Sequence, residues 1–312
     1  MMTKTFSKIG KADAAIAGGK GASLGEMTKA KIPVPPGFVI LAEAFDRFLI
    51  ETDLIQELSS LLGKVNYNDI NSVDGASSSI RALIAQAKMP ADLAKEITVE
   101  FKKLKTPFVA VRSSATAEDS SAASWAGELE TYLNTTDKTL LNNVKLCWSS
   151  LFTPRAIFYR HEKKMLKTKV SVAVVVQKMV ASEISGIAFT VHPVTQDRRQ
   201  MIIEAGYGLG EAIVSGSVTP DSYVLDKQDF SLLDINIAEQ ERQIVKCLRK
   251  GVKWTPVAKN LQAKQKLSGL QIVALGKICA GIEKHYGFPC DIEWAYAQKK
   301  FYITQSRPIT TL

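Results

Sequence analysis

The sequence predicts an α+β protein built as two lobes, and three observations support this prediction. The 312 residues are 46% hydrophobic and 23% charged, an ordinary globular composition, and they are numerous enough for two compact lobes. Apolar residues recur at helical spacing through much of the first half. From Val170 onward, short runs rich in Val, Ile and Phe indicate strands. The predicted lobes are therefore residues 1–168 and 169–312.

The first predicted lobe combines helices with a few strands. Three prolines in residues 33–37 force an extended segment ahead of an apolar strand at 38–41. Helical spacing follows through 42–62, and the polar segment 66–79, which contains Gly and Ser, indicates a loop. The other elements predicted here are helices at 79–88 and 91–104, strands at 108–111 and 130–134, and a helical stretch over 139–164 that Pro154 interrupts.

The second predicted lobe is rich in strands. A helix at 267–286 ends at Gly287, a plausible C-cap with Pro289 just beyond it. Two further strands flank a polar turn and form a hairpin, at 291–296 and 301–305. The remaining predicted strands are 172–180, 184–191, 201–204, 222–226 and 242–246.

Composition argues against several classes of protein. No apolar run approaches the ~20 residues of a membrane helix, and residues 1–11 lack a secretory signal, which predicts a cytoplasmic protein without membrane contact. Four scattered cysteines and three distant histidines predict buried free thiols and no zinc site. The net charge of +9 suits an anionic partner, but no basic motif is interleaved with aromatic residues, so nucleic acid is not the expected partner.

Two basic residues lie where a phosphate could bind. Lys20 belongs to the segment Gly18-Gly19-Lys20-Gly21, which opens a helix and lets the backbone approach an anion. A glycine-rich turn with a solvated lysine explains that segment equally well, and Gly21 excludes a Walker A loop. Arg112 ends a predicted strand and could present a bidentate fork to phosphate, although a surface ion pair explains its position more simply.

The predicted C-terminal hairpin carries four polar side chains. Asp291 and Glu293 share one face of their strand, and Gln305 and Arg307 share a face of the other. Carboxylate and amide oxygens suit Mg²⁺, which takes few protein ligands and keeps waters and phosphate oxygens. A surface hairpin with alternating polar residues is the alternative. The segment 206–211 lacks the third glycine of a dinucleotide fingerprint and is interpreted as a structural turn.

Seven segments, taken together and in order, resemble the N-terminal ATP-binding domain of the phosphoenolpyruvate synthase and pyruvate phosphate dikinase family. The resemblance spans nearly the whole chain and implies an ATP-grasp fold, with two lobes and ATP between them. The segments that carry it are 19–27, 34–38, 111–119, 147–152, 208–211, 291–294 and 305–308.

The resemblance also implies roles for individual residues. Lys20 and Arg112 would hold the phosphates of ATP, and Arg307 would pair with the phosphate being transferred. Glu293 and Gln305 would hold Mg²⁺. The phosphate loop of the small lobe would comprise Gly127, Glu128, Leu129, Glu130 and Thr131; the adenine would be lined by Gln177, Met179 and Val180, with Glu183 at the ribose.

The implied activity is a phosphotransferase reaction of the pyruvate, water dikinase type. Phosphoryl would pass from Mg-ATP to a histidine on a separate swivelling domain, with release of AMP and phosphate. None of His161, His192 and His285 has the Gly-Gly-x-x-Ser-His context of that histidine. The phosphohistidine domain is therefore expected in trans or lost by truncation, and the chain alone is expected not to complete the reaction.

Two departures from the family pattern leave alternatives open. Glu128 replaces a glutamine of the phosphate loop and would repel phosphate if its side chain pointed toward it. Residues 189–195 are closer to archaeal-type synthases and to rifampicin phosphotransferases. A rifampicin phosphotransferase-like ATP-binding domain, or a non-catalytic ATP-binding subunit, is therefore an alternative function.

Overall fold

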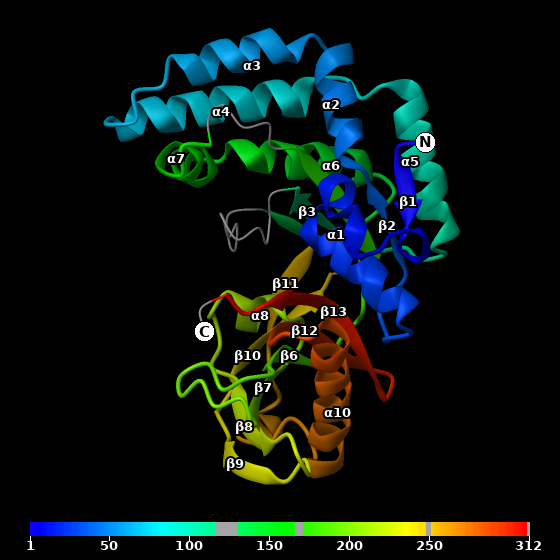
Figure 1. Ribbon diagram of the computed structural model, residues 1–312, viewed down its shortest axis with the longest axis vertical. Coiled ribbons are helices and arrows are strands. Elements are labelled where there is room, and N and C mark those ends of the chain that lie inside the picture. The colour runs from blue at the N-terminus through cyan, green and yellow to red at the C-terminus, as the bar shows by residue number, and fades with distance from the viewer. Residues whose placement is uncertain (117–129, 166–170, 248–250, 311–312) are drawn as a thin grey trace. The chain divides into compact units, whose positions relative to one another are not determined.

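The computed structural model describes residues 1–116, 130–165, 171–247 and 251–310, which belong to two compact units (Figure 1). Unit 1 comprises Met1–Glu26 and Pro36–Met179, and unit 2 comprises Met27–Pro35 and Val180–Leu312. The units divide after Met179 rather than at the predicted residue 168. The reason is that strand β5 (Val172–Lys178) pairs with strands of unit 1 on both of its edges. The segment 27–35, expected in the first lobe, joins unit 2.

Unit 1 is built on a five-stranded sheet in which every neighbouring pair is antiparallel. The strands lie in the order β1-β2-β5-β3-β4. The central strand β5 has buried Val residues at consecutive positions, as expected for a strand covered on both faces. The other strands are β1 (Thr3–Thr5), β2 (Gly37–Ile40), β3 (Val109–Ala115) and β4 (Thr131–Thr135).

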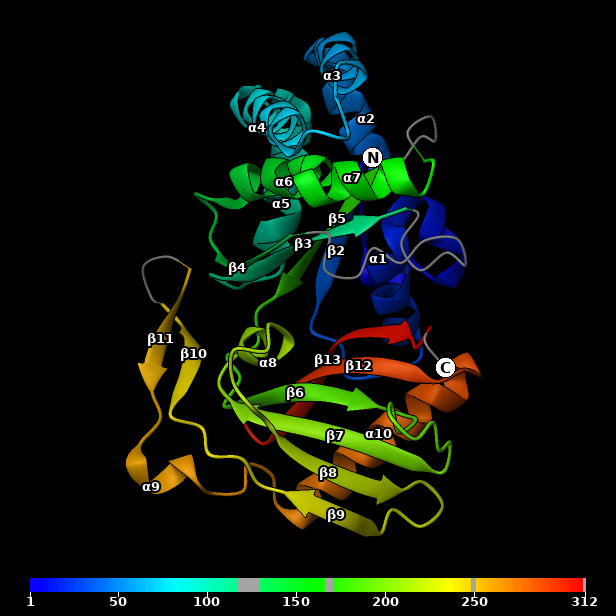
Figure 2. The ribbon, with the colours of Figure 1, turned by 90° about the vertical axis from the view of Figure 1, so that its left-hand side faces the viewer.

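A layer of helices covers one face of this sheet (Figure 2). Trp148 is fully buried there, with its ring 5.5 Å from that of Phe45 and 5.1 Å from that of Phe48. The helices of the layer are α2 (Ala42–Glu51), α3 (Leu54–Gly63), α4 (Ile70–Gln86), α5 (Ala91–Lys103), α6 (Leu140–Ser149) and α7 (Pro154–Glu162), with the short 3₁₀ turn η3 (Ser150–Phe152) between the last two. On the N-terminal side of α1 (Ala14–Lys29) lie the 3₁₀ turns η1 (Phe6–Lys8) and η2 (Lys11–Asp13).

Helix α4 corrects the predicted loop at 66–79. The side chain of Asp69 caps the helix by accepting a hydrogen bond from the N–H of Asn71. Val73, Ile80 and Ile84 are buried on one face of α4, while the Gly and Ser residues that indicated a loop are mostly on its exposed face. The predicted interruption at Pro154 is confirmed: α7 begins at this proline.

Unit 2 contains a six-stranded antiparallel sheet in the order β13-β12-β6-β7-β8-β9. Its strands are β6 (Ile184–Phe189), β7 (Gln200–Tyr207), β8 (Asp221–Asp226), β9 (Leu232–Asn236), β12 (Cys290–Ala297) and β13 (Lys300–Pro308). A separate two-stranded ribbon is formed by β10 (Arg242–Lys246) and β11 (Val252–Pro256). Short helices are α8 (Glu211–Val214) and α9 (Lys259–Gln262).

Helix α10 (Gly269–Tyr286) packs on one face of the six-stranded sheet. Ser268 and Gln271 form a capping box at its start, and Gly287 ends it with φ 77°, which confirms the predicted C-cap. Leu275, Cys279 and Ile282 are buried on the helix. The sequence did not indicate the edge strands β1 and β9 or strand β11, because each is short and largely polar or exposed.

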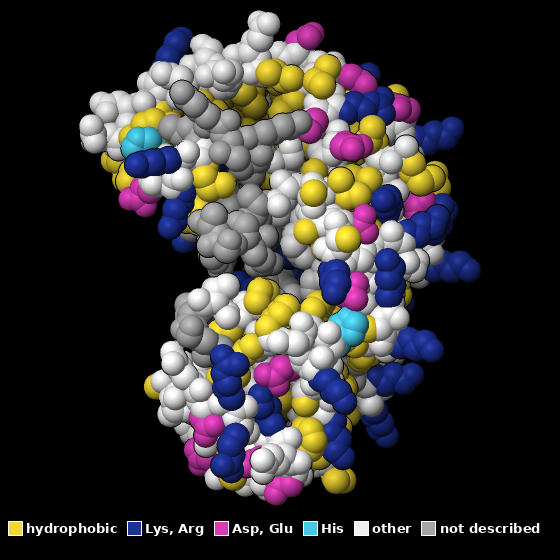
Figure 3. All heavy atoms as spheres, in the orientation of Figure 1, with side chains coloured by type: hydrophobic (Ala, Val, Ile, Leu, Met, Phe, Trp, Pro, Cys, Tyr) yellow, Lys and Arg dark blue, Asp and Glu magenta, His cyan; other side chains and the backbone are white. Residues whose placement is uncertain are grey.

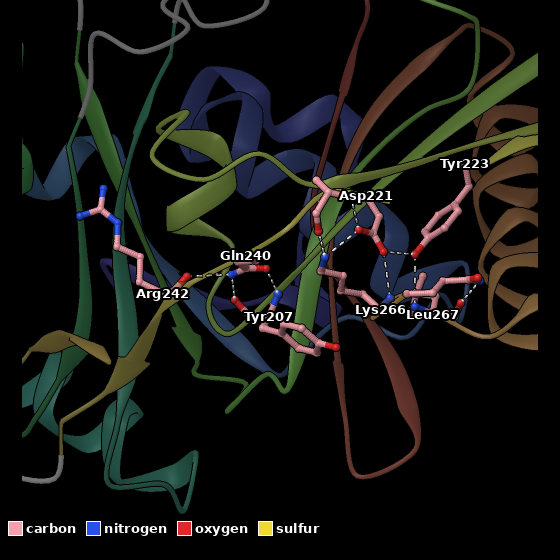
Figure 4. Close-up of polar contacts among 9 residues, drawn as sticks. Tyr207, Asp221, Tyr223, Gln240, Arg242, Lys266 and Leu267 are labelled. Atoms are coloured by element: carbon pink, nitrogen blue, oxygen red, sulfur yellow. Dashed lines mark hydrogen bonds and ion pairs between the residues drawn. The ribbon is translucent and has the colours of Figure 1, made fainter. Parts of the chain in front are cut away.

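A buried ion pair joins β8 to two later segments of unit 2 (Figure 4). The Nζ atom of Lys266 lies 2.7 Å from Oδ1 of Asp221, and both side chains are fully buried. Asp221 also accepts hydrogen bonds from the hydroxyl of Tyr223 and from the N–H groups of Ala238 and Lys266. One ammonium group neutralises this carboxylate, and one hydroxyl and two backbone N–H groups satisfy its remaining hydrogen-bonding capacity. Burying the carboxylate without these partners would cost much free energy.

Other composition-based predictions can be compared with the structure. All four cysteines are free; Cys147, Cys279 and Cys290 are buried as predicted, whereas Cys247 is only half-buried. On the face shown in Figure 3, Lys and Arg side chains are interspersed with Asp and Glu. Among the residues that the structure describes, no helix is long and apolar enough to cross a membrane.

Candidate functional site

Helix α1 is broken at Gly18, and the break places Lys20 in the first turn of the part that follows. Gly18 has φ +69°, and a Cβ atom there would lie 2.1 Å from the Oγ atom of Ser114 on β3. The Ser114 hydroxyl donates to the carbonyl of Ala17 and accepts from the N–H of Gly21. Ser114 therefore bridges the break, and the glycine segment lies directly against the strand that carries Arg112.

Replacing Gly18 with Ala is expected to lower the free energy of unfolding by at least about 2 kcal/mol. The new methyl group would overlap β3, and φ would lie in a region that L residues rarely adopt. Gly75→Ala is the matched control, because that helical glycine has open space around it and should gain about 0.5–1 kcal/mol. Urea denaturation measures both changes. Equal stability of the two variants would contradict the close approach at Gly18.

Arg112 and Gln177 lie on the same face of the unit 1 sheet as α1. Arg112 is opposite Thr131 on β4 and Val175 on β5, and Gln177 is two residues beyond Val175. Arg112 is 7% exposed and Gln177 is 2% exposed. Within the described part of the chain, the Nε2 atom of Gln177 has no hydrogen-bond partner. A buried donor of this kind suits the acceptor of a bound ligand.

The charge of Lys20 affects the Cys147 thiol, which lies beside Glu130. Burial raises the pKa of the Cys147 thiol, the charge of Glu130 raises it further, and the charge of Lys20 opposes this effect. The carboxylate of Glu130 is already bound by Arg81, 2.6 Å away, and by the Tyr132 hydroxyl. The carbonyl of Glu130 accepts from Ser113. The predicted contact of Glu130 with phosphate therefore depends on its backbone N–H. Gly127, Glu128 and Leu129 lie outside the described residues.

Gln177 lies within β5, and the other predicted adenine and ribose residues follow this strand where unit 1 gives way to unit 2 along the chain. Met179 is the last residue of unit 1 and donates its N–H to the carbonyl of Phe108, and Val180 is the first residue of unit 2 after it. The Oε1 atom of Glu183 accepts a hydrogen bond from the N–H of Gln298 in the β12–β13 turn. In this structure the carboxylate of Glu183 is thus tied to that turn.

The turn at Gly208 is anchored to the segment around Glu183. Gly208 has φ +88°, its N–H donates to the carbonyl of Glu183, and its carbonyl accepts from the hydroxyls of Ser182 and Ser185. Gln240, 2% exposed, binds both the N–H and the carbonyl of Tyr207 (Figure 4). The turn predicted within 206–211 lies at residues 208–210, between β7 and α8. No local pattern had indicated the part played by Ser182, Ser185 and Gln240.

The predicted C-terminal hairpin is confirmed, with its four polar residues in direct register. Asp291 lies opposite Arg307, and Glu293 lies opposite Gln305. The Nε and Nη2 atoms of Arg307 are 2.9 and 2.8 Å from Oδ2 of Asp291. Gln305 is 5% exposed. The residues that the sequence placed on common faces therefore form two adjacent cross-strand pairs, one a cation with a carboxylate and the other a carboxylate with an amide.

Glu204 is an acidic residue near this hairpin that sequence reasoning missed. It lies on β7 opposite Ile187, which is itself opposite Glu293, so the two glutamates share a face of the sheet. Burial raises the pKa of Glu204, and the charge of Asp291 adds to the effect. Burial also raises the pKa of Asp291, although Arg307 opposes the rise. Only the pairing of β6 with β7 and β12 could have revealed Glu204.

These carboxylates are consistent with a divalent cation. Burial is the main cause of the raised pKa values of Glu204 and Asp291, and a nearby cation would lower both values. Among the described residues, no group of three or more His, Cys, Asp or Glu side chains is arranged to hold a metal. Glu293 and Gln305 therefore fit Mg²⁺ as a partial ligand set completed by water and phosphate oxygens, and do not fit a metal held by protein ligands alone.

Unit 1 carries the basic side chains of Lys20 and Arg112, and unit 2 carries the oxygen-bearing side chains of Glu293 and Gln305. Side chains of these types bind phosphate and a divalent cation, respectively, in other proteins. The comparison with known families identifies the class of protein. The chain belongs to the family of the pyruvate phosphate dikinase AMP/ATP-binding domain, which matches residues 14–312. The predicted family resemblance is confirmed, and so is the mixed α/β fold with antiparallel sheets.

Several curated proteins are similar over nearly the whole chain. A probable phosphoenolpyruvate synthase of Methanocaldococcus jannaschii is 46% identical over 98% of this chain and 26% of its own length. A probable phosphoenolpyruvate synthase of Archaeoglobus fulgidus is 46% identical over 98% of this chain and 41% of its own. The rifampicin phosphotransferase of Bacillus subtilis is 38% identical, over 98% and 35%. The chain therefore spans less than half of the length of these relatives.

Proposed function

We propose that the two units are the lobes of an ATP-grasp fold with ATP bound between them. In this proposal the chain transfers phosphoryl from Mg-ATP to a histidine of a separate swivelling domain and releases AMP and phosphate. The register of the β12–β13 hairpin is the main support, because it sets Glu293 against Gln305 and Arg307 against Asp291. Membership of an AMP/ATP-binding family identifies the nucleotide for which such residues are suited.

Each basic residue has a distinct part in the proposed transfer. Lys20 and Arg112 bind phosphate oxygens, with Lys20 as a point charge and Arg112 as a planar fork. Arg307 compensates the charge that develops on the phosphoryl group during transfer. Such a reaction depends on positioning and charge neutralisation more than on covalent help from the protein. The orphaned amide donor of Gln177 and the residues Met179 and Val180 would bind the adenine, and Glu183 the ribose.

Glu293 and Gln305 are the proposed holders of Mg²⁺. When bound, the ion would neutralise negative charge on the phosphates of ATP. The carboxylates of Glu204 and Asp291 support this assignment, because both lie on the same face of the sheet as Glu293.

The proposed reaction needs a phosphohistidine domain that we expect in trans or as a further part of the same enzyme. The similar synthases and the phosphotransferase are all longer than this chain, which supports such a partner. The phosphoenolpyruvate synthase reaction is the proposed overall activity; the rifampicin phosphotransferase belongs to the same family and is not a better fit. A cytoplasmic location stays a prediction.

Calorimetric titration with Mg-ATP tests the nucleotide site. Wild-type protein is expected to saturate, and Lys20→Ala is expected to weaken binding about 10- to 100-fold, the loss of one charge-assisted contact. Lys29→Ala is the matched control, because Lys29 is an exposed lysine in the last turn of the same helix. Failure of folded wild-type protein to bind, or equal affinities of the two variants, would contradict the proposal.

A further inference from the structure

The two edges of the six-stranded sheet in unit 2 differ in how they are protected. At the β13 edge, the N–H of Ile303 donates to the carbonyl of Pro33, 2.9 Å away, so the segment 27–35 covers that edge. At the other edge, β9 is the outermost strand in both ribbon views (Figures 1 and 2). Among the described residues, β8 is the only strand that pairs with β9.

The exposed edge strand β9 carries apolar side chains, whereas edge strands of natural sheets usually carry charged residues or proline. Leu233 and Ile235 on β9 and Ile237 just after it are alternate residues, and they are 51%, 43% and 44% exposed. Ile235 lies opposite Tyr223, a fully buried residue whose hydroxyl accepts from Leu267 just before α10. Edge strands are normally guarded by Lys, Pro or inward-pointing charges. Strand β9 has neither Lys nor Pro, and Asp234 is its single charged residue.

The backbone N–H and C=O groups of these apolar residues point away from β8, toward the open edge of the sheet. The N–H of Ala238 points toward β8, where it donates to Oδ1 of Asp221. Hydrogen-bonding directions alternate along an antiparallel strand, so the N–H and C=O groups of Ile235 and Ile237 are directed away from β8. The bulge between β8 and β9 lies at Leu232 and Leu233, so the regular stretch of β9 begins beside Leu233 and runs through Asp234, Ile235 and Asn236.

We propose that β9 pairs antiparallel with β9 of a second copy of this chain, across a two-fold axis at Ile235. In this register Ile235 faces its own copy, Leu233 faces Ile237, and Asp234 faces Asn236. Every apolar residue then has an apolar partner, and the carboxylate has an amide. An axis at Asp234 would set two carboxylates against each other, and an axis at Asn236 would set Leu233 against Glu239.

The proposed pairing also accounts for an exposed residue on α10. A two-fold axis perpendicular to the sheets keeps both α10 helices on the same side of the joined sheet. Leu270 in the first turn of α10 is 87% exposed and lies three residues after Leu267, which contacts Tyr223. Leu270 is therefore on the same side of the joined sheet as the apolar row of β9, because Tyr223 and Ile235 share that face. The pairing does not depend on nucleotide binding.

Cysteine cross-linking tests the register. Cys247→Ser provides the background, because the other three native thiols are buried. In that background, Ile235→Cys is expected to form a disulfide-linked dimer under mild oxidation, since directly paired residues are within disulfide range. Leu233→Cys and Ile237→Cys should form no disulfide-linked dimer separately and should cross-link when mixed. Equal cross-linking of all three single variants, or of none, would overturn the proposal.

The mass in solution provides a second test on the same protein. Light scattering after gel filtration, at about 100 µM so that a micromolar complex is populated, should give twice the chain mass for the wild type. Ile235→Lys should give the monomer mass with an unchanged thermal melt, because Ile235 is partly exposed. Ile55→Lys on α3, with 49% exposure, should remain dimeric. A monomeric wild type, or a dimeric Ile235→Lys variant, would overturn the proposal.

Discussion

Replacing Arg307 with Ala is expected to lower phosphoryl transfer to a supplied phosphohistidine domain by about 10³-fold or more. The affinity for ATP should change by less than about threefold, because the guanidinium acts mainly on charge that develops during transfer. The measurement is transfer of label from [β-³²P]ATP to the histidine domain, made beside calorimetric ATP binding; the β label is needed because release of AMP leaves the β-phosphoryl group on the histidine. Normal turnover by the variant would exclude Arg307 from the proposed role.

Two further variants separate the charge of Arg307 from its placement. Arg307→Lys keeps a positive charge but loses the planar fork, so it should recover little of the activity. Asp291→Asn keeps the shape of the partner but removes the carboxylate that lies 2.8 Å from Nη2 of Arg307. We expect an intermediate loss of about tenfold, seen in the transfer rate rather than in ATP affinity.

The same assay distinguishes an enzyme from a non-catalytic ATP-binding subunit. Wild-type protein that binds Mg-ATP but labels no histidine domain would favour the subunit. Labelling by the wild type and loss of labelling in Arg307→Ala would favour the proposed phosphotransferase. The assay separates an enzyme from a non-catalytic subunit whatever the final phosphoryl acceptor is, because the histidine is labelled before phosphoryl reaches that acceptor.

Replacing Lys266 with Met is expected to lower the free energy of unfolding by about 3–5 kcal/mol. The variant removes the cation of a fully buried ion pair and leaves the carboxylate of Asp221 without its main counter-charge. Urea denaturation followed by circular dichroism measures the change. Lys264→Met is the matched control, because Lys264 is an exposed lysine in the same segment, and it should change stability by less than about 0.5 kcal/mol.

A double variant identifies the cause of the loss. Lys266→Met combined with Asp221→Asn removes both charges and keeps hydrogen-bonding atoms near Tyr223 and the N–H of Ala238. The double variant should be more stable than Lys266→Met alone, because an unpaired buried charge costs more than a neutral amide. A double variant with additive losses would show that packing of the lysine chain, rather than charge, stabilises this part of unit 2.

Elements with strong local signals were predictable from the sequence. The run of valines in β5 indicated a strand, and Gly287 marked the end of α10. The alternation of the C-terminal hairpin placed Asp291 with Glu293 on a common face, and the register confirms it. The predicted helix at 79–88 covers only the end of α4, and the first part of α4 was missed because its buried residues are separated by Gly and Ser, whose local preference is for turns.

The sequence by itself determined the spacing of apolar residues along helices and strands, the helix cap at Gly287 and the types of functional side chain. These features depend on neighbours along the chain. The tertiary structure alone decided which sheet receives each strand, and it therefore placed β5 in unit 1. It also decided that Glu204 lies near Asp291 and that Arg81 occupies the carboxylate of Glu130. Such contacts join residues far apart in the sequence, and they form only when strand pairing and burial bring their charges together.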